Sequence, residues 1–412
     1  MKKKLVSGLL VAAMSLSMLA GSIVSLADEA TDAVLKDGDT TEILMVWPGS
    51  NASPASMQEV EDAMNELIAP VADAKIKLQI IEWGAYDDQI NLMLSSGEKL
   101  DIFLGTSNIR ERGQRGQLYD IAEDVQTYAP DAYAAMERYI NACYFDGALY
   151  GLPIYRDMAA QAGLICRKDI LDETGFTVDD VKTMDDVEKV IEKVHELHPE
   201  MYALIPSDLK SGCLLNYIKG QFDDISSGVG VAMDDDASDG VTVVNIYDTE
   251  EYKEMAKVAY DWNQKGYFMP DSTTNTTPRQ DILKANNAFG YFGNYHPGIV
   301  TQEVMNTGMD IVAMPITEKS LSTQSVNNIE WLVAAQTENP EKTLAVLNLL
   351  YSSADFQNLF RYGIEGKDYE VKDAEKGIAG YPEGVTSATV GWGNQDTPLA
   401  LGIAPVGVAR FV

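Results

Sequence analysis

A regular alternation of short apolar runs with amphipathic helical patterns over residues 42–104 constrains the fold of this chain more than any other feature. Apolar runs at 42–47 and 101–104 have the length of buried strands, and the alternation of polar and aliphatic residues at 75–80 also predicts a strand. The segment 56–70 between them carries a helical pattern and opens with Ser56 and Glu59, the spacing of a capping box. A second helical pattern spans 85–96 and stops at Gly97. This order of strands and helices predicts a parallel sheet covered by helices, which is an α/β fold.

The same kind of pattern continues through the rest of the chain. Helices are predicted at 120–128, 130–142, 183–197, 249–265 and 339–352, and strands at 148–154, 162–166, 288–292, 310–314 and 329–335. A chain of 412 residues exceeds the size of most single domains. We therefore expect two α/β lobes.

The N-terminus has the features of a secretory signal peptide. Three lysines at 2–4 precede an apolar stretch from Leu5 to Leu19, and Ser25 and Ala27 form a small-x-small cleavage site. We exclude residues 1–27 from the fold and interpret the polar segment 28–40 as a flexible leader. Ser22 stands where a lipoprotein signal would carry cysteine. The expected protein is exported, extracellular or associated with the cell surface, with no thioether-linked lipid.

Composition excludes several classes of function. A formal net charge of −32 repels nucleic acid and anionic lipid. Three cysteines without CxxC spacing do not predict a disulfide framework or a zinc site. The sequence has no GxSxG, P-loop or HExxH motif, and its 63 acidic residues make any carboxylate pair uninformative. We expect no cofactor, no metal and no nucleic-acid partner.

Several segments are individually weak signals but specific as a set. They are Trp47–Ser50, Glu82–Tyr86, Asn91–Glu98, Tyr150–Pro153, Arg156–Asp157, Lys265–Tyr267, Asn339–Lys342, Leu347–Tyr351, Gly363–Lys367, Tyr381–Val385 and Gly393–Gln395. Together they resemble family 1 extracellular solute-binding proteins of ABC importers, most closely the Firmicute branch that carries a C-terminal domain of unknown function. The resemblance extends over residues 41–395.

The resemblance implies a two-lobed periplasmic-binding-protein-like fold of type II, with lobes joined by crossing strands and a cleft between them. Residues 41–152 and 328–352 would form lobe 1, and residues 153–327 and 353–395 would form lobe 2. Residues 396–412 match nothing in the family pattern, so lobe 2 is expected to be incomplete. The implied protein is a monomeric, non-enzymatic receptor for a small molecule, and an oligosaccharide is the favoured cargo. It would capture this molecule by hinge closure and deliver it to an ABC transporter permease.

Candidate ligand residues follow from the chemistry of carbohydrates and the geometry of α/β sheets. Aromatic rings bury the C–H faces of a sugar, paired polar groups bind its hydroxyls, and open α/β sheets bind ligands beyond the carboxyl ends of their strands. An aromatic residue at a strand end also often belongs to the core, so each candidate has a structural alternative. The candidates are Trp47, Trp83, Tyr86, Thr106, Ser107, Tyr155, Arg156, Asp157, Tyr291, Tyr295 and Trp331.

Three other interpretations stay open at this point. The same receptor fold can carry a peptide or an acidic sugar instead of a neutral one. A glycan-acting enzyme would need two placed carboxylates, which the sequence cannot identify. The atypical segment 396–412 and Ser22 also allow a truncated, non-functional copy.

Overall fold

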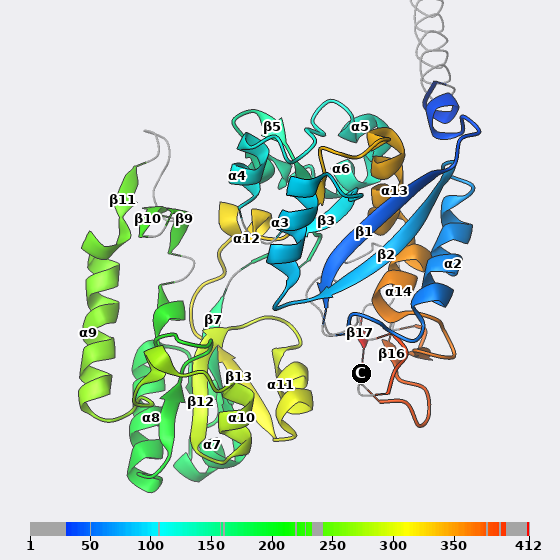
Figure 1. The fold of residues 1–412 in the computed structure, drawn as a ribbon. Coiled ribbons are helices and arrows are strands. Elements are labelled where there is room, and N and C mark those ends of the chain that lie inside the picture. The colour runs from blue at the N-terminus through cyan, green and yellow to red at the C-terminus, as the bar shows by residue number, and fades with distance from the viewer. Residues whose placement is uncertain are drawn as a thin grey trace, which may run out of the picture. The chain divides into compact units, whose positions relative to one another are not determined.

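The computed structural model describes residues 30–49, 51–105, 108–156, 158–159, 161–218, 221–226, 228–232, 242–375, 378–386, 389–392 and 410–411. The chain divides into two compact units (Figure 1). Unit 1 contains the residues up to Arg156 and those from Asn327 onward, and unit 2 is the continuous segment Asp157–Val326. Each unit is built on its own sheet with helices against it, so the α/β prediction is confirmed.

Unit 1 is organised by a five-stranded sheet in the order β2-β1-β3-β14-β6. Strands β1, β2 and β3 are parallel, as the alternating pattern predicts, and β14 runs antiparallel to both β3 and β6. The chain moves from β1 outward to β2 and then back to β3. Right-handed crossovers therefore place α2 and α3 on opposite faces (Figure 1). The strands are β1 (Thr41–Gly49), β2 (Ala74–Glu82), β3 (Ile102–Gly105), β6 (Gly151–Pro153) and β14 (Glu330–Val333).

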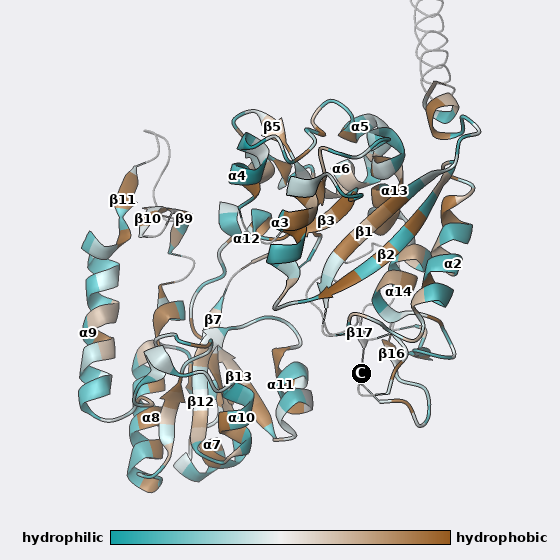
Figure 2. Ribbon diagram, viewed as in Figure 1, coloured by the Kyte–Doolittle hydropathy of each residue, from teal (hydrophilic) through white to brown (hydrophobic). Residues whose placement is uncertain are grey.

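The other elements of unit 1 cover this sheet or extend from it. Helices α13 and α14 pack against each other, and α14 also packs against α2. Figure 2 shows hydrophobic residues concentrated in the strands and hydrophilic residues along much of the helices. The remaining elements are α2 (Met57–Ile68), α3 (Tyr86–Ser96), α4 (Ile109–Gln114), α5 (Val125–Tyr128), α6 (Pro130–Met136), η1 (Ile140–Cys143), β4 (Tyr144–Phe145), β5 (Ala148–Leu149), α13 (Pro340–Ser352), α14 (Ala354–Tyr362), β15 (Glu370–Asp373), β16 (Ile378–Gly380) and β17 (Arg410–Phe411).

The segment before β1 is held against unit 1, contrary to the prediction of a flexible leader. Residues 30–35 are helical, and the Leu35 side chain is buried. The ammonium group of Lys342, itself buried, donates to Asp37 Oδ1 and to the Asp39 carbonyl oxygen, both at 2.7 Å. A buried ammonium group requires such partners, and Lys342 on α13 therefore fixes a segment that has little apolar surface of its own.

The segment after α13 belongs to unit 1, whereas the sequence placed residues 353–395 in lobe 2. Phe360 of α14 lies 5.1 Å from the Trp47 ring and 5.7 Å from the Trp331 ring, measured between centroids. Trp392 is fully buried, 6.2 Å from Trp47, and its Nε1 donates to the Phe360 carbonyl oxygen at 2.9 Å. We call Trp47, Trp331, Phe360 and Trp392 the aromatic cluster. It joins β1 and β14 to the C-terminal part of the chain.

Ser56 begins α2, but the predicted capping box with Glu59 is absent. The Ser56 hydroxyl instead donates to Oδ1 of the buried Asp368 at 2.9 Å. The Ser56 amide donates to the Gly391 carbonyl oxygen at 3.0 Å. Since a buried carboxylate must be hydrogen-bonded, this tertiary contact takes the hydroxyl that local sequence assigned to the helix end.

Unit 2 is organised by a four-stranded sheet in the order β13-β7-β12-β8. Strand β12 is parallel to β8 and antiparallel to β7, and β13 is antiparallel to β7. Alternating residues of the strands face two cores: Leu164 and Cys166 belong to the one beneath α8 and α9, and Ile165 to the one beneath α10 and α11. Thr183 and Asp186 form a capping box at the start of α8, where the sequence predicts a helix from residue 183.

Three further strands of unit 2 form a small antiparallel sheet in the order β11-β10-β9. Unit 2 contains β7 (Ala162–Arg167), α7 (Lys168–Thr174), η2 (Val178–Asp180), α8 (Met184–Leu197), β8 (Tyr202–Ile205), η3 (Leu215–Tyr217), β9 (Phe222–Ser226), β10 (Val229–Ala232), β11 (Val243–Asn245), η5 (Ile246–Asp248), α9 (Glu250–Gln264), η6 (Ser272–Thr274), α10 (Arg279–Lys284), β12 (Ala288–Asn294), α11 (Ile299–Thr307) and β13 (Ile311–Pro315), with α12 (Thr323–Asn327) at its end. Among the helices that the structure describes, none combines the length and the apolar character of a membrane span. The signal peptide predicted at 1–27 lies outside the described residues.

Candidate functional site

One edge of the unit 1 sheet combines two features that matter for ligand binding. The register pairs Glu330, the first residue of β14, with Gly105 at the end of β3 and with Pro153 at the end of β6. The carboxyl ends of the mutually parallel strands β1, β2, β3 and β6 therefore lie along one edge. Both chain connections to unit 2 also leave from this edge, after β6 and before β14. We call it the connection edge of unit 1, and it is where open α/β sheets bind ligands.

The two connections are tied together where they leave unit 1. The Ile154 amide donates to the Ile329 carbonyl oxygen at 3.3 Å, and Arg156 Nη2 donates to Asn328 Oδ1. Tyr155 and Arg156 are both partly exposed here. The structure thus places these two predicted residues at the connection edge. Asp157, predicted with them, lies outside the described residues.

Trp83 is the predicted aromatic residue that the structure leaves most open. It follows the last residue of β2, and 48% of its surface is exposed. A β-carbon built on the neighbouring Gly84 would meet no atom within 4 Å outside its chain neighbours, so the turn that follows β2 is open at this position. An exposed tryptophan at the carboxyl end of a parallel strand can offer its ring face to a ligand.

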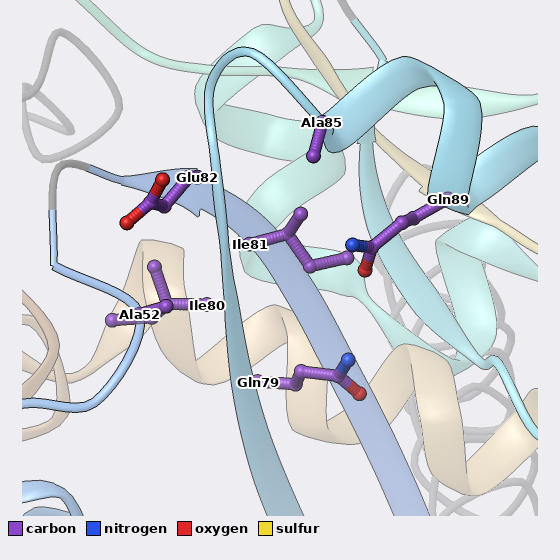
Figure 3. A pocket seen from close by; sticks show the side chains of 7 residues that line it. All are labelled: Ala52, Gln79, Ile80, Ile81, Glu82, Ala85 and Gln89. Atoms are coloured by element: carbon purple, nitrogen blue, oxygen red, sulfur yellow. The ribbon is translucent and has the colours of Figure 1, made fainter.

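A pocket of about 250 Å³ is lined by Glu82 and Ala85, which lie on either side of Trp83 in the sequence (Figure 3). The C-terminal part of β2 and the first turns of α3 form most of it, and Figure 3 shows the Ile81 side chain extending toward the amide of Gln89. The volume is below that of typical drug-sized ligand sites. Such a pocket fits part of a ligand that extends along the edge. Its lining residues are Ala52, Gln79, Ile80, Ile81, Glu82, Ala85 and Gln89.

Trp47 and Trp331 are core residues in this structure, although the sequence proposed them as ligand contacts. Both are buried in the aromatic cluster, where Phe360 packs against each of their rings. Aromatic rings at these separations stabilise each other beyond the area they bury. Their role here is to anchor α14 behind the connection edge.

Tyr86 is also a packing residue. Its hydroxyl accepts from the Leu104 amide at 2.9 Å and donates to the Leu104 carbonyl oxygen at 2.8 Å. Burial raises the pKa of this phenol well above its ordinary value, so the hydroxyl stays protonated and serves as both donor and acceptor. Tyr86 therefore fixes the end of β3 to the start of α3. The predicted residues Thr106 and Ser107, which follow β3, lie outside the described residues.

The unit 2 sheet has an edge of the same kind. The carboxyl ends of β8 and β12 lie beside the start of β7, where the chain enters unit 2, and the end of β13, where it leaves. Tyr295 is partly exposed just after β12, and its amide donates to the Gln161 carbonyl oxygen at 2.7 Å. Tyr291, predicted as a ligand residue, is instead buried beneath the Arg279 guanidinium group, 4.8 Å from its ring centroid. We call this the connection edge of unit 2.

Sequence reasoning missed polar residues that the structure places at these edges. Glu82 and Gln89 line the pocket, and Asp208 is exposed just beyond β8. Asp208 had a usable signal, because a polar residue directly after a short apolar run marks a strand end. Gln89 had none, because its position depends on how α3 returns across β2.

The cysteines and the potential metal ligands bear on whether the chain could carry out thiol or metal chemistry. The three cysteines are free and buried, and burial raises the pKa of each thiol, so they are poor nucleophiles. Within the described residues, no three His, Cys, Asp or Glu side chains cluster to hold a metal ion.

Comparison with known proteins gives a family and a close relative. Residues 66–364 match the family model described as bacterial extracellular solute-binding protein. A protein of Streptococcus pneumoniae serotype 4, described as a carbohydrate ABC transporter substrate-binding protein, is 25% identical over 361 residues. The aligned part covers 85% of this chain and 69% of that protein.

Solved structures share the fold. The N-glycan transport solute-binding protein of Streptococcus pneumoniae superposes with a TM-score of 0.75 at 22% identity, over 89% of this chain and 79% of that one. Its complex with Man5GlcNAc gives 0.62 at 24% identity, over 88% and 78% of the two chains. An ABC substrate-binding protein of Listeria monocytogenes in complex with cycloalternan gives 0.54 at 12% identity, over 78% of each chain. The two-sheet α/β architecture predicted from the sequence is therefore confirmed.

Proposed function

This chain belongs to the bacterial extracellular solute-binding protein family, and from that premise we propose that it captures an oligosaccharide at its connection edges and delivers it to an ABC importer. The pneumococcal relative is described as a carbohydrate receptor of an ABC transporter, and the aligned part spans most of both chains. Family membership favours a receptor over a glycan-acting enzyme.

The observation that carries the proposal is the chemistry of the unit 1 connection edge. Trp83, a half-exposed tryptophan, directly follows Glu82, which lines the pocket together with Gln89. Stacking on the ring and hydrogen bonding to hydroxyls are the two interactions by which proteins bind sugars. The Arg156 guanidinium group at the same edge adds a donor.

The path of the chain supports a hinge motion as part of this proposal. Both connections join the two edges that we propose to contact the ligand, so a ligand held by both edges would favour a closed state over an open one. The expected partner is the permease of the importer, as for other receptors of this family.

We expect Trp83→Ala to weaken oligosaccharide binding by about fivefold to thirtyfold, because a stacked aromatic ring contributes about 1–2 kcal/mol. Titration calorimetry with neutral oligosaccharides measures the effect, and Trp83→Phe should keep part of the affinity. Tyr260→Ala is the matched control, since Tyr260 is exposed on α9 and at neither connection edge. Unchanged affinity in Trp83→Ala would contradict the placement of the site.

The same titration separates the cargo classes. A neutral oligosaccharide, a uronate oligosaccharide and a peptide are each added to the wild-type protein. Binding of the neutral sugar with no heat from the peptide supports the proposal. Binding of the peptide alone would replace it with a peptide receptor, and binding of the uronate alone with an acidic-sugar receptor.

A further inference from the structure

Unit 2 contains an ion pair between a fully buried carboxylate on α11 and a partly buried guanidinium group on α10. Arg279 Nη2 donates to Glu303 Oε1 at 3.0 Å, and the Glu303 side chain is 0% exposed. The Arg279 guanidinium group also lies over the Tyr291 ring. Because desolvating two charges offsets most of their attraction, such a pair contributes little net stability. Its role is better sought in what Arg279 holds.

Arg279 holds the segment that follows β8. Its Nη1 donates to the Ser207 carbonyl oxygen at 2.7 Å, and Ser207 is buried at the connection edge of unit 2. Gly293, near the end of β12, allows this approach. A β-carbon there would lie 2.8 Å from the Tyr291 ring and 3.2 Å from Ser207 Cβ. Arg279 therefore contacts both the Tyr291 ring and the Ser207 carbonyl oxygen.

The Ser207 side chain continues the network outward. Asn216 Nδ2 donates to Ser207 Oγ at 2.8 Å, and Ser207 Oγ donates to Asp208 Oδ2 at 2.9 Å. Each donor in this relay points toward the carboxylate, and Asp208 itself is exposed. A carboxylate fixed by one hydrogen bond and open to solvent is a strong acceptor for a hydroxyl. The partly exposed Tyr295 at the same edge supplies an aromatic ring.

We propose that Asp208 accepts hydrogen bonds from ligand hydroxyls in unit 2, and that Arg279, anchored by Glu303, is the residue that positions it through Ser207. This inference rests on the proposed function and deepens it. A fixed carboxylate at the edge favours neutral sugars and repels uronates, so it also assigns the class of cargo.

The test uses the full-length mature protein and measures two quantities for each variant. One is the Kd for neutral oligosaccharides, with Man5GlcNAc as the first probe and an alginate oligosaccharide as the anionic one. The other is the melting temperature without ligand. The variants are Asp208→Asn, Arg279→Lys and the double variant. Arg167→Lys is the matched control, because Arg167 is a buried guanidinium group paired with Asp169 at the opposite end of the same sheet.

We expect Asp208→Asn to weaken binding of the neutral sugar about tenfold with no change in melting temperature, and Arg279→Lys to weaken it about fivefold. The double variant should lose no more than about tenfold in affinity relative to the wild type, because Arg279 acts through Asp208. Arg167→Lys should lower the melting temperature and leave Kd unchanged.

Three results would overturn the inference. Wild-type affinity in Asp208→Asn removes Asp208 from the site. If the losses of affinity of the two single variants multiply in the double variant, Arg279 does not act through Asp208 and is a structural residue only. The same holds if Arg279→Lys, like Arg167→Lys, lowers the melting temperature and leaves Kd unchanged. If ligand binding depends on Trp83 and one of these three results is found, the proposed function stands and only this inference fails. If the wild-type protein binds neither sugar, both the proposed function and this inference fail.

Discussion

Replacing Trp392 with alanine is expected to lower the free energy of unfolding by about 3–5 kcal/mol, the usual cost of removing a fully buried tryptophan. The buried indole ring packs against Trp47, and its Nε1 donates to the Phe360 carbonyl oxygen. Truncation therefore leaves a cavity and removes this hydrogen bond. A urea titration followed by circular dichroism measures the change.

Two variants make this result specific. Trp392→Phe keeps most of the apolar surface and loses the hydrogen bond, so it should cost less, about 1–2 kcal/mol. Trp83→Ala removes an exposed ring of the same type and should change the free energy of unfolding by less than about 1 kcal/mol. If Trp392→Ala unfolds at the same urea concentration as Trp83→Ala, the C-terminal segment does not belong to the core of unit 1.

Replacing Glu330 with glutamine is expected to remove a pH dependence from the stability of unit 1. Glu330 lies on β14 with its side chain fully buried, and among the described residues neither carboxylate oxygen has a hydrogen-bond partner. Burial raises the pKa of this carboxyl to about 8. The native protein therefore holds this proton at neutral pH, whereas the unfolded chain releases it.

The direction of the effect follows from the protons bound. The native state binds more protons than the unfolded state between the ordinary carboxyl pKa near 4.5 and the native pKa near 8. The free energy of unfolding thus falls as pH rises through this window and levels off above it. At about 1.4 kcal/mol per pKa unit, the loss by pH 8.5 is about 3–5 kcal/mol.

Urea titrations at pH 5, 7 and 8.5 check this prediction. Glu330→Gln, which is neutral at every pH, should lie close to the wild type at pH 5 and be more stable at pH 8.5. Glu42→Gln on β1, another strand of the same sheet, is the control, because Glu42 is exposed. Parallel pH profiles for wild type and Glu330→Gln would show that this carboxyl does not titrate as its burial implies.

The sequence predicted the elements of the fold well, because strands and helices depend on periodicities within a dozen residues. It did not predict where the last part of the chain packs. Residues 353–392 contain an amphipathic helix that could cover either sheet. The choice depends on Trp392 and Phe360 meeting Trp47, more than 300 residues earlier. The Ser56 hydroxyl was misassigned for the same reason, since its partner Asp368 is 312 residues away.

The candidate site could be predicted by region and not by residue. Trp47 and Trp83 carry the same local signal, a tryptophan next to a glycine or proline turn at the end of a strand. The structure buries the first and exposes the second. What separates them is the presence of a distant aromatic partner, and no local pattern encodes that. The polar candidates had the opposite difficulty, because hydroxyls, amides and carboxylates near strand ends are numerous.

The division of unit 1 between the two ends of the chain has a consequence for biosynthesis. Unit 2 is a continuous segment and can reach its native state as soon as residue 326 has emerged. The N-terminal strands, although made first, stay without β14 and the aromatic cluster until the last residues arrive. Domains usually fold in the order of their synthesis. Here the strands made first are completed last, so the N-terminal part of unit 1 is the part of a nascent chain that stays incomplete the longest.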